Sequence, residues 1–236
     1  MKYKKLSIVV PVYNEINTIK TILNKLDKLK IPIKKEIVII DDYSTDGTRD
    51  ILKKLQKKKK YKIIFHKENM GKGAALRTGF GHLTGDLVTV QDADTEYDPD
   101  DYNKLLPYFL NGKRKVVYGS RFIGVSFFSR KKWFSPVHYI GNKLLSLMAS
   151  IIYFSKITDM ETCYKMIDAN VLKSLKLRAK KFDIEPEITA KILKKGYKIK
   201  EVPINYYPRS FHQGKKISWK DGVYALFYLL KYRFSD

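Results

Sequence analysis

Four carboxylates are concentrated in the stretch QDADTEYD, residues 91–98. Asp92, Asp94 and Glu96 are spaced two residues apart, so their side chains would share one face of an extended strand. Mg²⁺ and Mn²⁺ prefer hard oxygen ligands of this kind, and Mg²⁺ is usually bound by one or two carboxylates together with substrate phosphates. The spacing therefore predicts Mg²⁺ or Mn²⁺ at these three residues, carrying a nucleotide diphosphate.

A structural interpretation of the same acidic stretch is also open. The segment DPDD, residues 98–101, directly precedes a helical pattern, and Asp at such a position caps the first turn of a helix. An Asp-x-Asp pattern is too common to identify a metal site by itself. A metal site therefore needs support from other polar residues that lie near the acidic stretch.

Short apolar runs rich in β-branched residues alternate with helical patterns in the first half of the chain. We expect strands at residues 6–13, 36–41, 62–66, 86–92 and 115–120. We expect helices at about 19–26, 46–57, 72–83 and 100–111. The alternation predicts an α/β, Rossmann-like fold with a mostly parallel sheet flanked by helices. In the second half, we expect helices at 187–195 and 219–232 and a strand within 197–207.

Polar residues follow several of the predicted strands. Ligands bind beyond the carboxyl ends of the strands in open parallel sheets, so these residues are candidates for a binding site. Asp42, after the second strand, is expected to hydrogen-bond a ribose or a base edge. Lys72 lies between Gly71 and Gly73 at a predicted helix start, where backbone N–H groups and the lysine would bind an anionic nucleotide sugar. An ordinary glycine-containing turn is the alternative.

The composition is strongly basic, with 47 Lys and Arg against 24 Asp and Glu and a net charge of +23. Such a charge attracts phosphates, nucleic acid or an anionic membrane surface, although evenly spread lysines also fit a compositional habit of the source organism. Cys163 is the only cysteine, so no intramolecular disulfide can form. The longest apolar run, residues 144–154, is shorter than the ~20 residues of a membrane-spanning helix, so we expect no membrane crossing.

Several ordered motifs resemble those of one enzyme family. VVPVYNE, IIDDYSTDGT, NMGKGAALRTGF, VQDADTEYDP and YGSRF occur in the order found in family 2 glycosyltransferases with the GT-A fold. TDMETCYKM, FDIEPEITAKILKKGYKIKEVPINYYPRS and GKKISWKDG resemble, more narrowly, the dolichol-phosphate mannose synthase and polyprenyl-phosphate glucose synthase group. The resemblance implies one GT-A domain over residues 1–236, with a nucleotide-sugar-binding half at 1–121 and an acceptor-binding half at 122–236.

The resemblance also implies roles for individual residues. The nucleoside would be held by Pro11, Tyr13, Glu15, Ile40 and Asp42. The metal and the diphosphate would be held by Asp92 and Asp94, and Glu96 stands where mannose synthases have Gln, which would add a charged metal ligand. Arg121 would face the phosphates, while Arg209 and Lys215 would belong to a mobile loop that closes over donor and acceptor.

The acceptor end departs from the mannose synthases in one respect. An arginine that helps to hold the acceptor phosphate there has no clear counterpart in this chain. Asn142 lies in its neighbourhood, and Lys143 or the basic residues 130–132 are the candidates to replace it. Asp159 or Glu161 is expected to orient the acceptor or the loop, and these two would be the base candidates if the acceptor were a hydroxyl.

Together these features predict an inverting, metal-dependent transfer of a hexose from GDP-mannose, UDP-glucose or UDP-N-acetylglucosamine to a polyprenyl (dolichyl-type) phosphate. The alternative is a family 2 enzyme that glycosylates a hydroxyl of a polysaccharide or glycolipid. A non-catalytic basic module does not fit the ordered acidic motifs, so no nucleic-acid partner is expected. The oligomeric state is left open by the sequence.

We expect the protein to act at a membrane surface, because the predicted acceptor is a lipid. Residues 144–154 and a C-terminal amphipathic helix would lie in the interface or close the core. The apolar stripe of that helix consists of Val223, Leu226, Phe227, Leu230 and Phe234. These features predict a cytoplasmic protein attached peripherally to the cytoplasmic face of a membrane.

Overall fold

A computed structural model describes residues 2–124, 136–209 and 219–235. Its strands are β1 (Lys5–Val12), β2 (Lys34–Asp41), β3 (Lys62–Phe65), β4 (Leu87–Val90), β5 (Val116–Ser120), β6 (Lys165–Asp168) and β7 (Lys200–Pro203). They form one sheet in the order β3-β2-β1-β4-β6-β5-β7. All neighbouring pairs are parallel except those that involve β6, which runs antiparallel to β4 and β5. The prediction of a mostly parallel sheet is confirmed.

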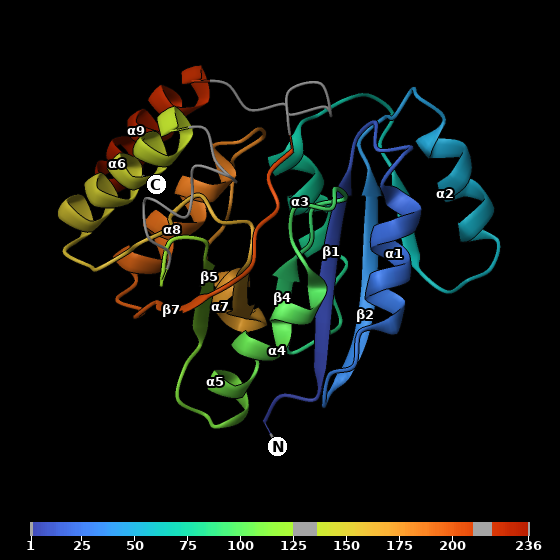
Figure 1. The fold of residues 1–236 in the computed structure, drawn as a ribbon, viewed down its shortest axis with the longest axis horizontal. Coiled ribbons are helices and arrows are strands. Elements are labelled where there is room, and N and C mark those ends of the chain that lie inside the picture. The colour runs from blue at the N-terminus through green and yellow to red at the C-terminus, as the bar shows by residue number, and fades with distance from the viewer. Residues whose placement is uncertain (1, 125–135, 210–218, 236) are drawn as a thin grey trace.

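Helices flank this sheet, as predicted (Figure 1). They are α1 (Ile19–Lys28), α2 (Thr48–Gln56), α3 (Lys72–Phe80), α6 (Pro136–Tyr153), α7 (Ala169–Ser174), α8 (Ile184–Lys194) and α9 (Trp219–Phe234). The single helix expected at 100–111 is instead divided into η1 (Pro99–Asp101), α4 (Tyr102–Leu105) and α5 (Pro107–Leu110). Pro107 explains the interruption, because it has no backbone N–H to continue the hydrogen-bond ladder.

Strand β6 and helix α7 were not expected from the sequence. The strand has only four residues, all buried, and α7 follows it without a linker. A run this short carries no periodicity that separates a strand from a helix. Asp168, the last strand residue, caps α7 by accepting hydrogen bonds from the backbone N–H groups of Asn170 and Val171.

Three parallel strands bring the acidic and polar loops together at one edge of the sheet. The carbonyl of Val12 at the end of β1 accepts a 2.8 Å hydrogen bond from the N–H of Asp42 after β2. Gln91, directly after β4, donates a 2.9 Å hydrogen bond to the carbonyl of Val9 in β1. The loops that follow β1, β2 and β4 are therefore held side by side by the sheet itself.

Helices α6 and α9 lie beside each other at the end of the molecule away from α1 and α2 (Figure 1). They form a second, smaller core with α8 whose buried residues include Ala149, Tyr153, Ala190, Leu229 and Tyr232. One face of α6 and one face of α9 are therefore buried in this core. The outer faces retain large exposed apolar side chains, which bear on function below.

Candidate active site

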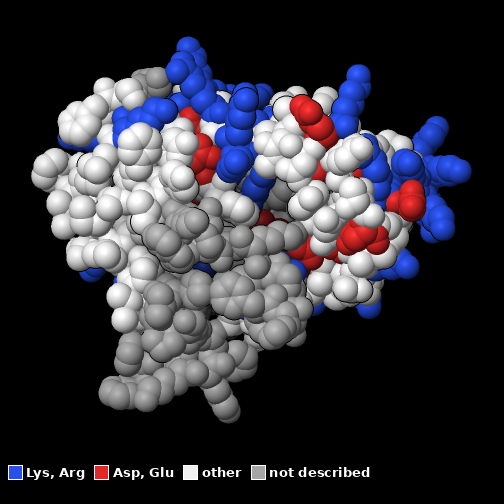
Figure 2. Space-filling view, turned by 90° about the horizontal axis from the view of Figure 1, so that it is seen from above, with Lys and Arg blue, Asp and Glu red and all other residues white. Residues whose placement is uncertain are grey.

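A cleft with a volume of about 420 Å³ lies at the carboxyl edge of β1, β2 and β4. Figure 2 looks onto this edge and shows basic and acidic side chains close together near its middle. The cleft brings together the predicted residues Pro11, Tyr13, Glu15, Asp42, Lys72, Asp92, Asp94, Glu96 and Arg209. Residues far apart in the sequence thus meet in one site, such as Asp94 and Arg209, which are 115 positions apart.

The cleft lining also includes polar and aromatic residues to which the sequence assigned no role: Asn69, Lys181, Phe182 and Tyr206. Lys181 and Phe182 reach it because their segment packs on the start of α3, where Gly73 donates a 3.1 Å backbone hydrogen bond to the Lys181 carbonyl. This contact joins positions 108 residues apart, and local spacing carries no information about it. Tyr206 falls within a quoted motif, but the motif alone assigns it no role.

The other predicted residues lie outside the cleft lining. Ile40 is fully buried in β2 beneath Gly79 of α3, so its side chain packs in the core, and its predicted contact with a nucleoside stays a prediction. Arg121 and Asp159 lie together behind Tyr206, as described below. Lys215 and the basic residues 130–132 lie outside the described residues.

Three backbone N–H groups at the start of α3 are already engaged within the protein. The N–H of Gly71 donates to Asp42 Oδ2 at 2.8 Å, and those of Gly73 and Ala74 donate to the carbonyls of Lys181 and Lys180. The glycines serve this close backbone approach, because a Cβ on Gly73 would lie 2.8 Å from the Lys181 carbonyl oxygen. At this helix the Lys72 side chain is a candidate for anion binding, since it lines the cleft.

Replacing Gly73 with alanine should therefore destabilise the fold. The added methyl group must displace the backbone of the 179–181 segment, which we expect to lower the free energy of unfolding by about 1 to 3 kcal/mol. Urea unfolding of Gly73→Ala measures this effect. Gly141→Ala on α6 is the matched control, because its added Cβ meets no atom within 4 Å, and an equal loss there would contradict the explanation.

Lys72 and Asp92 form a sheltered ion pair at the floor of the site. Lys72 Nζ lies 2.9 Å from Asp92 Oδ1 and 3.7 Å from Glu185 Oε1. Burial opposes ionisation of both partners, but the pairing prevails: the pKa of Lys72 is raised well above its usual value and that of Asp92 is lowered. Lys72 therefore stays cationic and Asp92 anionic at neutral pH.

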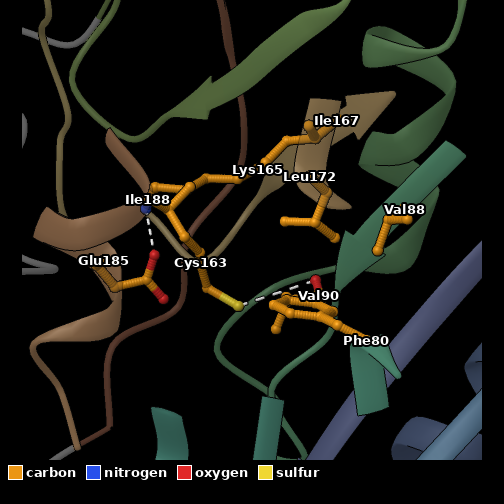
Figure 3. A pocket seen from close by; sticks show the side chains of 9 residues that line it. All are labelled: Phe80, Val88, Val90, Cys163, Lys165, Ile167, Leu172, Glu185 and Ile188. Carbon is orange, nitrogen blue, oxygen red and sulfur yellow. Dashed lines mark hydrogen bonds and ion pairs between the residues drawn. The ribbon is translucent and has the colours of Figure 1, made fainter. Parts of the chain in front are cut away.

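Glu185 connects this pair to a buried cluster between β4, β6 and α8. Its second oxygen pairs with Lys165, beside a small cavity of about 10 Å³ (Figure 3). Cys163 lies at the same place, 3.9 Å from the carbonyl of Val90, and burial raises the pKa of its thiol well above the usual value. The thiol is therefore a packed side chain and not a nucleophile.

Arg209 lies over the acidic stretch on the opposite side of the cleft. Its Nη2 donates to Asp94 Oδ2 at 2.9 Å, and its Nη1 lies 3.1 Å from Glu15 Oε2. Burial, and then the charges of Asp92 and Glu96, raise the pKa of Asp94 to about 7, and Arg209 opposes that rise. Three carboxylates thus share one guanidinium, since the Glu96 Oε1 atom is 3.7 Å from Arg209 Nε.

Glu96 fixes the segment that carries Arg209. Its Oε2 accepts a 2.8 Å hydrogen bond from the Tyr206 hydroxyl, and its Oε1 accepts one of the same length from the Arg209 backbone N–H. The Glu96 carbonyl accepts a third from the N–H of Tyr207. In this structure Glu96 therefore attaches residues 206–209 to the acidic loop.

The three predicted metal ligands do not converge on one point. Within the described ranges no group of three acidic, histidine or cysteine side chains forms a metal site. Asp92 is directed to Lys72, whereas Asp94 and Glu96 both contact Arg209. Because one cationic side chain already reaches both, Asp94 and Glu96 fit a divalent cation that takes its other ligands from a diphosphate. The role of Asp92 as a third ligand stays a prediction.

Asp98 confirms the structural interpretation for the end of the acidic stretch. Its side chain accepts a 3.1 Å hydrogen bond from the N–H of Asp100 and caps η1. The capping interpretation therefore holds for Asp98, whereas Asp92, Asp94 and Glu96 line the cleft.

Arg121 and Asp159 form a buried pair beneath the cleft wall. The guanidinium donates from Nε and Nη2 to the two carboxylate oxygens at 2.8 and 2.7 Å, and the Arg121 N–H adds a third bond. The arginine also lies 5.1 Å from the ring centre of Tyr206 and donates to Asn142 Oδ1 at 3.4 Å. Asp159 thus orients Arg121, and Asn142 is part of the same cluster.

Asp42 is held rigidly at the other end of the cleft. Its Oδ1 lies 2.7 Å from His66 Nδ1 and accepts a hydrogen bond from the N–H of Met70 at 2.9 Å. His66 Nε2 is in turn 2.9 Å from the Thr78 hydroxyl. These contacts fix the carboxylate, whose remaining lone pairs can accept an N–H or O–H of a nucleoside.

Glu161 is a buried carboxyl that makes the fold sensitive to pH. Burial raises its pKa from 4.5 to about 7, and its Oε1 has no hydrogen-bond partner among the described residues. The folded state therefore retains a proton that the unfolded state loses, so stability should fall as pH rises from about 4.5 to 7.

Glu161→Gln should remove this pH dependence. At pH 8 we expect the variant to be more stable than the wild type by roughly 2 kcal/mol, and at pH 4.5 the two should be alike. Urea unfolding at both pH values measures the difference. Glu68→Gln, a change at an exposed glutamate, should have no such effect; a Glu161→Gln protein without a gain at pH 8 would contradict the assignment.

Comparisons with known proteins show the family of this chain. The model of glycosyl transferase family 2 matches residues 7–176. A UDP-N-acetylglucosamine–dolichyl-phosphate N-acetylglucosaminyltransferase of Methanococcus voltae is 28% identical over 222 residues, which cover 86% of each chain. A dolichol-phosphate mannosyltransferase of Pyrococcus furiosus is 28% identical over 217 residues, and these cover 89% of this chain and 59% of the relative.

Solved structures share the fold at low sequence identity. Glucosyl-3-phosphoglycerate synthase of Mycobacterium tuberculosis, in complex with Mn²⁺, UDP and phosphoglyceric acid, has a TM-score of 0.69 and 15% identity over 99% of this chain and 80% of its own. Mannosyl-3-phosphoglycerate synthase of Rubrobacter xylanophilus has a TM-score of 0.73 and 18% identity over 97% and 72%. The chain belongs to glycosyl transferase family 2, because the model of that family matches most of its length.

Proposed function

We propose that this glycosyltransferase moves a hexose from a nucleotide diphosphate sugar to the phosphate of a polyprenyl lipid at a membrane surface. The observation that carries the proposal is the cleft itself, in which carboxylates and cationic side chains alternate at the carboxyl edge of the sheet. The names of the relatives from Methanococcus voltae and Pyrococcus furiosus, which specify dolichyl-phosphate acceptors, support it.

The donor would lie along the cleft from Asp42 to Arg209. Asp42 and Tyr13 would hold the nucleoside, and Asp94 with Glu96 would hold Mg²⁺ or Mn²⁺. The cation would neutralise the diphosphate as it departs, which is the main electrostatic requirement of this reaction. Mycobacterial glucosyl-3-phosphoglycerate synthase, which has this fold and was solved with Mn²⁺ or Mg²⁺ and UDP, supports a divalent cation. Lys72 and Arg209 would contribute fixed positive charge.

The acceptor end of the site favours a phosphate over a hydroxyl. A phosphate is already anionic at pH 7 and needs positioning, whereas a hydroxyl needs a base. Asp159, one candidate base, is completely buried and holds Arg121 with both of its oxygens. Arg121 and Tyr206 would therefore form the wall against which residues 122–236 present the acceptor.

The outer faces of α6 and α9 suit a lipid surface. Figure 2 shows a mostly uncharged area over these helices, beside the charged middle of the same face. Its exposed apolar residues are Ile140, Leu144, Leu147, Ile151, Phe154, Val223, Tyr224, Phe227, Leu230 and Phe234. Among the described helices none is both long and apolar enough to cross a membrane. Peripheral attachment through this α6–α9 face, at the cytoplasmic side, is therefore part of the proposal.

Attachment through the α6–α9 face predicts a loss of vesicle binding when the face is charged. Leu147→Asp combined with Phe227→Asp should weaken binding to anionic vesicles at least about tenfold, because two apolar side chains no longer insert. Co-sedimentation with vesicles measures this. Asn103→Asp with Asn111→Asp has the same charge change at exposed positions of the α4–α5 region, and equal weakening there would rule out an apolar contact.

A donor panel tests the proposed function. The protein is incubated with Mn²⁺ or Mg²⁺, polyprenyl phosphate and each of GDP-mannose, UDP-glucose and UDP-N-acetylglucosamine, and lipid products are identified by mass spectrometry. A glycolipid from at least one donor is expected. Transfer to a soluble sugar or polysaccharide with no lipid product would instead favour an enzyme that glycosylates hydroxyls.

A further inference from the structure

We propose that Arg209 and the divalent cation compete for the same carboxylates, so that the cation binds well only together with a nucleotide diphosphate that takes over Arg209. The proposal rests on the proposed function in one respect, the binding of a cation at Asp94 and Glu96. It goes further by assigning to Arg209 the control of when that cation binds.

The contacts of Arg209 are the first basis for this competition. Its guanidinium lies 2.9 Å from Asp94 Oδ2, 3.1 Å from Glu15 Oε2 and 3.7 Å from Glu96 Oε1. The Arg209 side chain is only 14% exposed, so these pairs are largely sheltered from water. The guanidinium therefore occupies the carboxylate oxygens that a cation between Asp94 and Glu96 would need.

The remaining oxygens of these two residues are also engaged. Asp94 Oδ1 accepts a 3.1 Å hydrogen bond from the N–H of Glu96. Glu96 Oε1 and Oε2 accept from the Arg209 N–H and the Tyr206 hydroxyl. A cation can gain strong carboxylate contacts here only if the guanidinium is displaced and the segment 206–209 shifts with it.

Charge balance makes the two occupants mutually exclusive. A divalent cation beside the guanidinium would place like charges at the same oxygens, which is costly in a partly buried site. Removing the guanidinium without a replacement would leave Glu15, Asp94 and Glu96 close together without their shared positive partner, which is also costly. The carboxylates stay neutralised only if the divalent cation enters as the Arg209 guanidinium leaves.

A nucleotide diphosphate makes this exchange favourable at both ends. It supplies oxygen ligands to the entering cation and an anionic partner to the displaced Arg209, which pairs with phosphates readily through its planar guanidinium. Cation and nucleotide therefore strengthen each other's binding, and the coupling is reciprocal. Arg209 also prevents strong metal binding without the donor, and its displacement moves a positive charge to the leaving group.

Metal binding without nucleotide tests the proposal. Mn²⁺ affinity is measured by electron paramagnetic resonance and by calorimetry for the wild type, Arg209→Gln, Arg209→Lys and Arg77→Gln. Arg77 is an exposed arginine on α3, outside the cleft lining, and provides the matched change in net charge. Arg209→Gln should bind Mn²⁺ about tenfold more tightly than the wild type, the scale of a partly buried charge pair. Arg209→Lys and Arg77→Gln should remain near the wild type.

The outcomes separate this inference from the proposed function. Equal or weaker Mn²⁺ binding by Arg209→Gln, or equal tightening by Arg77→Gln, overturns the competition. If the wild type binds Mn²⁺ in the presence of UDP or GDP, the proposed metal-dependent function survives that result. If no protein binds Mn²⁺ even with UDP or GDP, both the competition and the metal-dependent function are overturned.

Discussion

Asp94→Asn is expected to lower kcat by about 10²- to 10³-fold while the protein remains folded. Asp94 lines the cleft and contacts Arg209, and burial together with its acidic neighbours raises its pKa to about 7. Asn keeps the size of the side chain but removes the charge that a cation needs. The loss should appear in kcat at saturating donor, because charge on the leaving group develops as the bond breaks.

Steady-state kinetics with each donor that is active for the wild type measure this effect. Asp98→Asn is the matched control, since Asp98 is in the same acidic stretch but caps η1 and does not line the cleft. The control should keep kcat within a few-fold of the wild type. An Asp94→Asn enzyme that retains more than about a tenth of wild-type kcat would show that the acidic loop is not the site of diphosphate stabilisation.

Asp159→Asn should lower the free energy of unfolding by about 3 kcal/mol, because it leaves the buried Arg121 guanidinium without its counter-charge. Asp159 is completely buried and Arg121 is 8% exposed, so water cannot compensate for the lost partner. Activity should fall as well, since Arg121 and Tyr206 would lose their fixed positions. The pH dependence of kcat should keep its shape, because Asp159 takes no proton from the acceptor.

A double-mutant cycle separates this role from a catalytic one. Arg121→Gln with Asp159→Asn should destabilise the fold by less than the sum of the single changes, because both members of the pair are then neutral. Urea unfolding of the four proteins measures the coupling. Strictly additive changes would mean that the pair contributes nothing to stability. Loss of one limb of the pH profile in Asp159→Asn would identify a base and favour a hydroxyl acceptor.

Much of the fold follows from local pattern. The β-branched runs at the positions of β1, β2 and β4 predict buried parallel strands, and the stripe of α1 predicts a helix that packs on them. Strand β6 was missed because four residues next to α7 carry no period, and it is the strand that makes the sheet mixed. One continuous helix was expected at 100–111, but Pro107 interrupts it.

Site residues that directly follow strands could be predicted from the sequence. Site residues that reach the cleft through contacts between distant segments could not. Asp42, Asp92 and Asp94 follow strands that the sheet aligns, so sequence alone brings them together. Lys181 reaches the cleft only through contact of its segment with α3. Glu96 was expected to bind a metal, and its long-range contacts with Tyr206 and Arg209, which no local pattern reveals, give it a second role as the anchor of residues 206–209.

The most direct test of the central claim compares two lipids that differ only in the phosphate. The protein is incubated with a divalent cation, an isotope-labelled nucleotide sugar and either polyprenyl phosphate or the corresponding polyprenol, and the labelled lipid is isolated. We predict label on polyprenyl phosphate alone, in a glycosyl phosphate that mild acid cleaves, and none with Asp94→Asn. Label on polyprenol, or on a soluble acceptor with none on polyprenyl phosphate, would contradict the account.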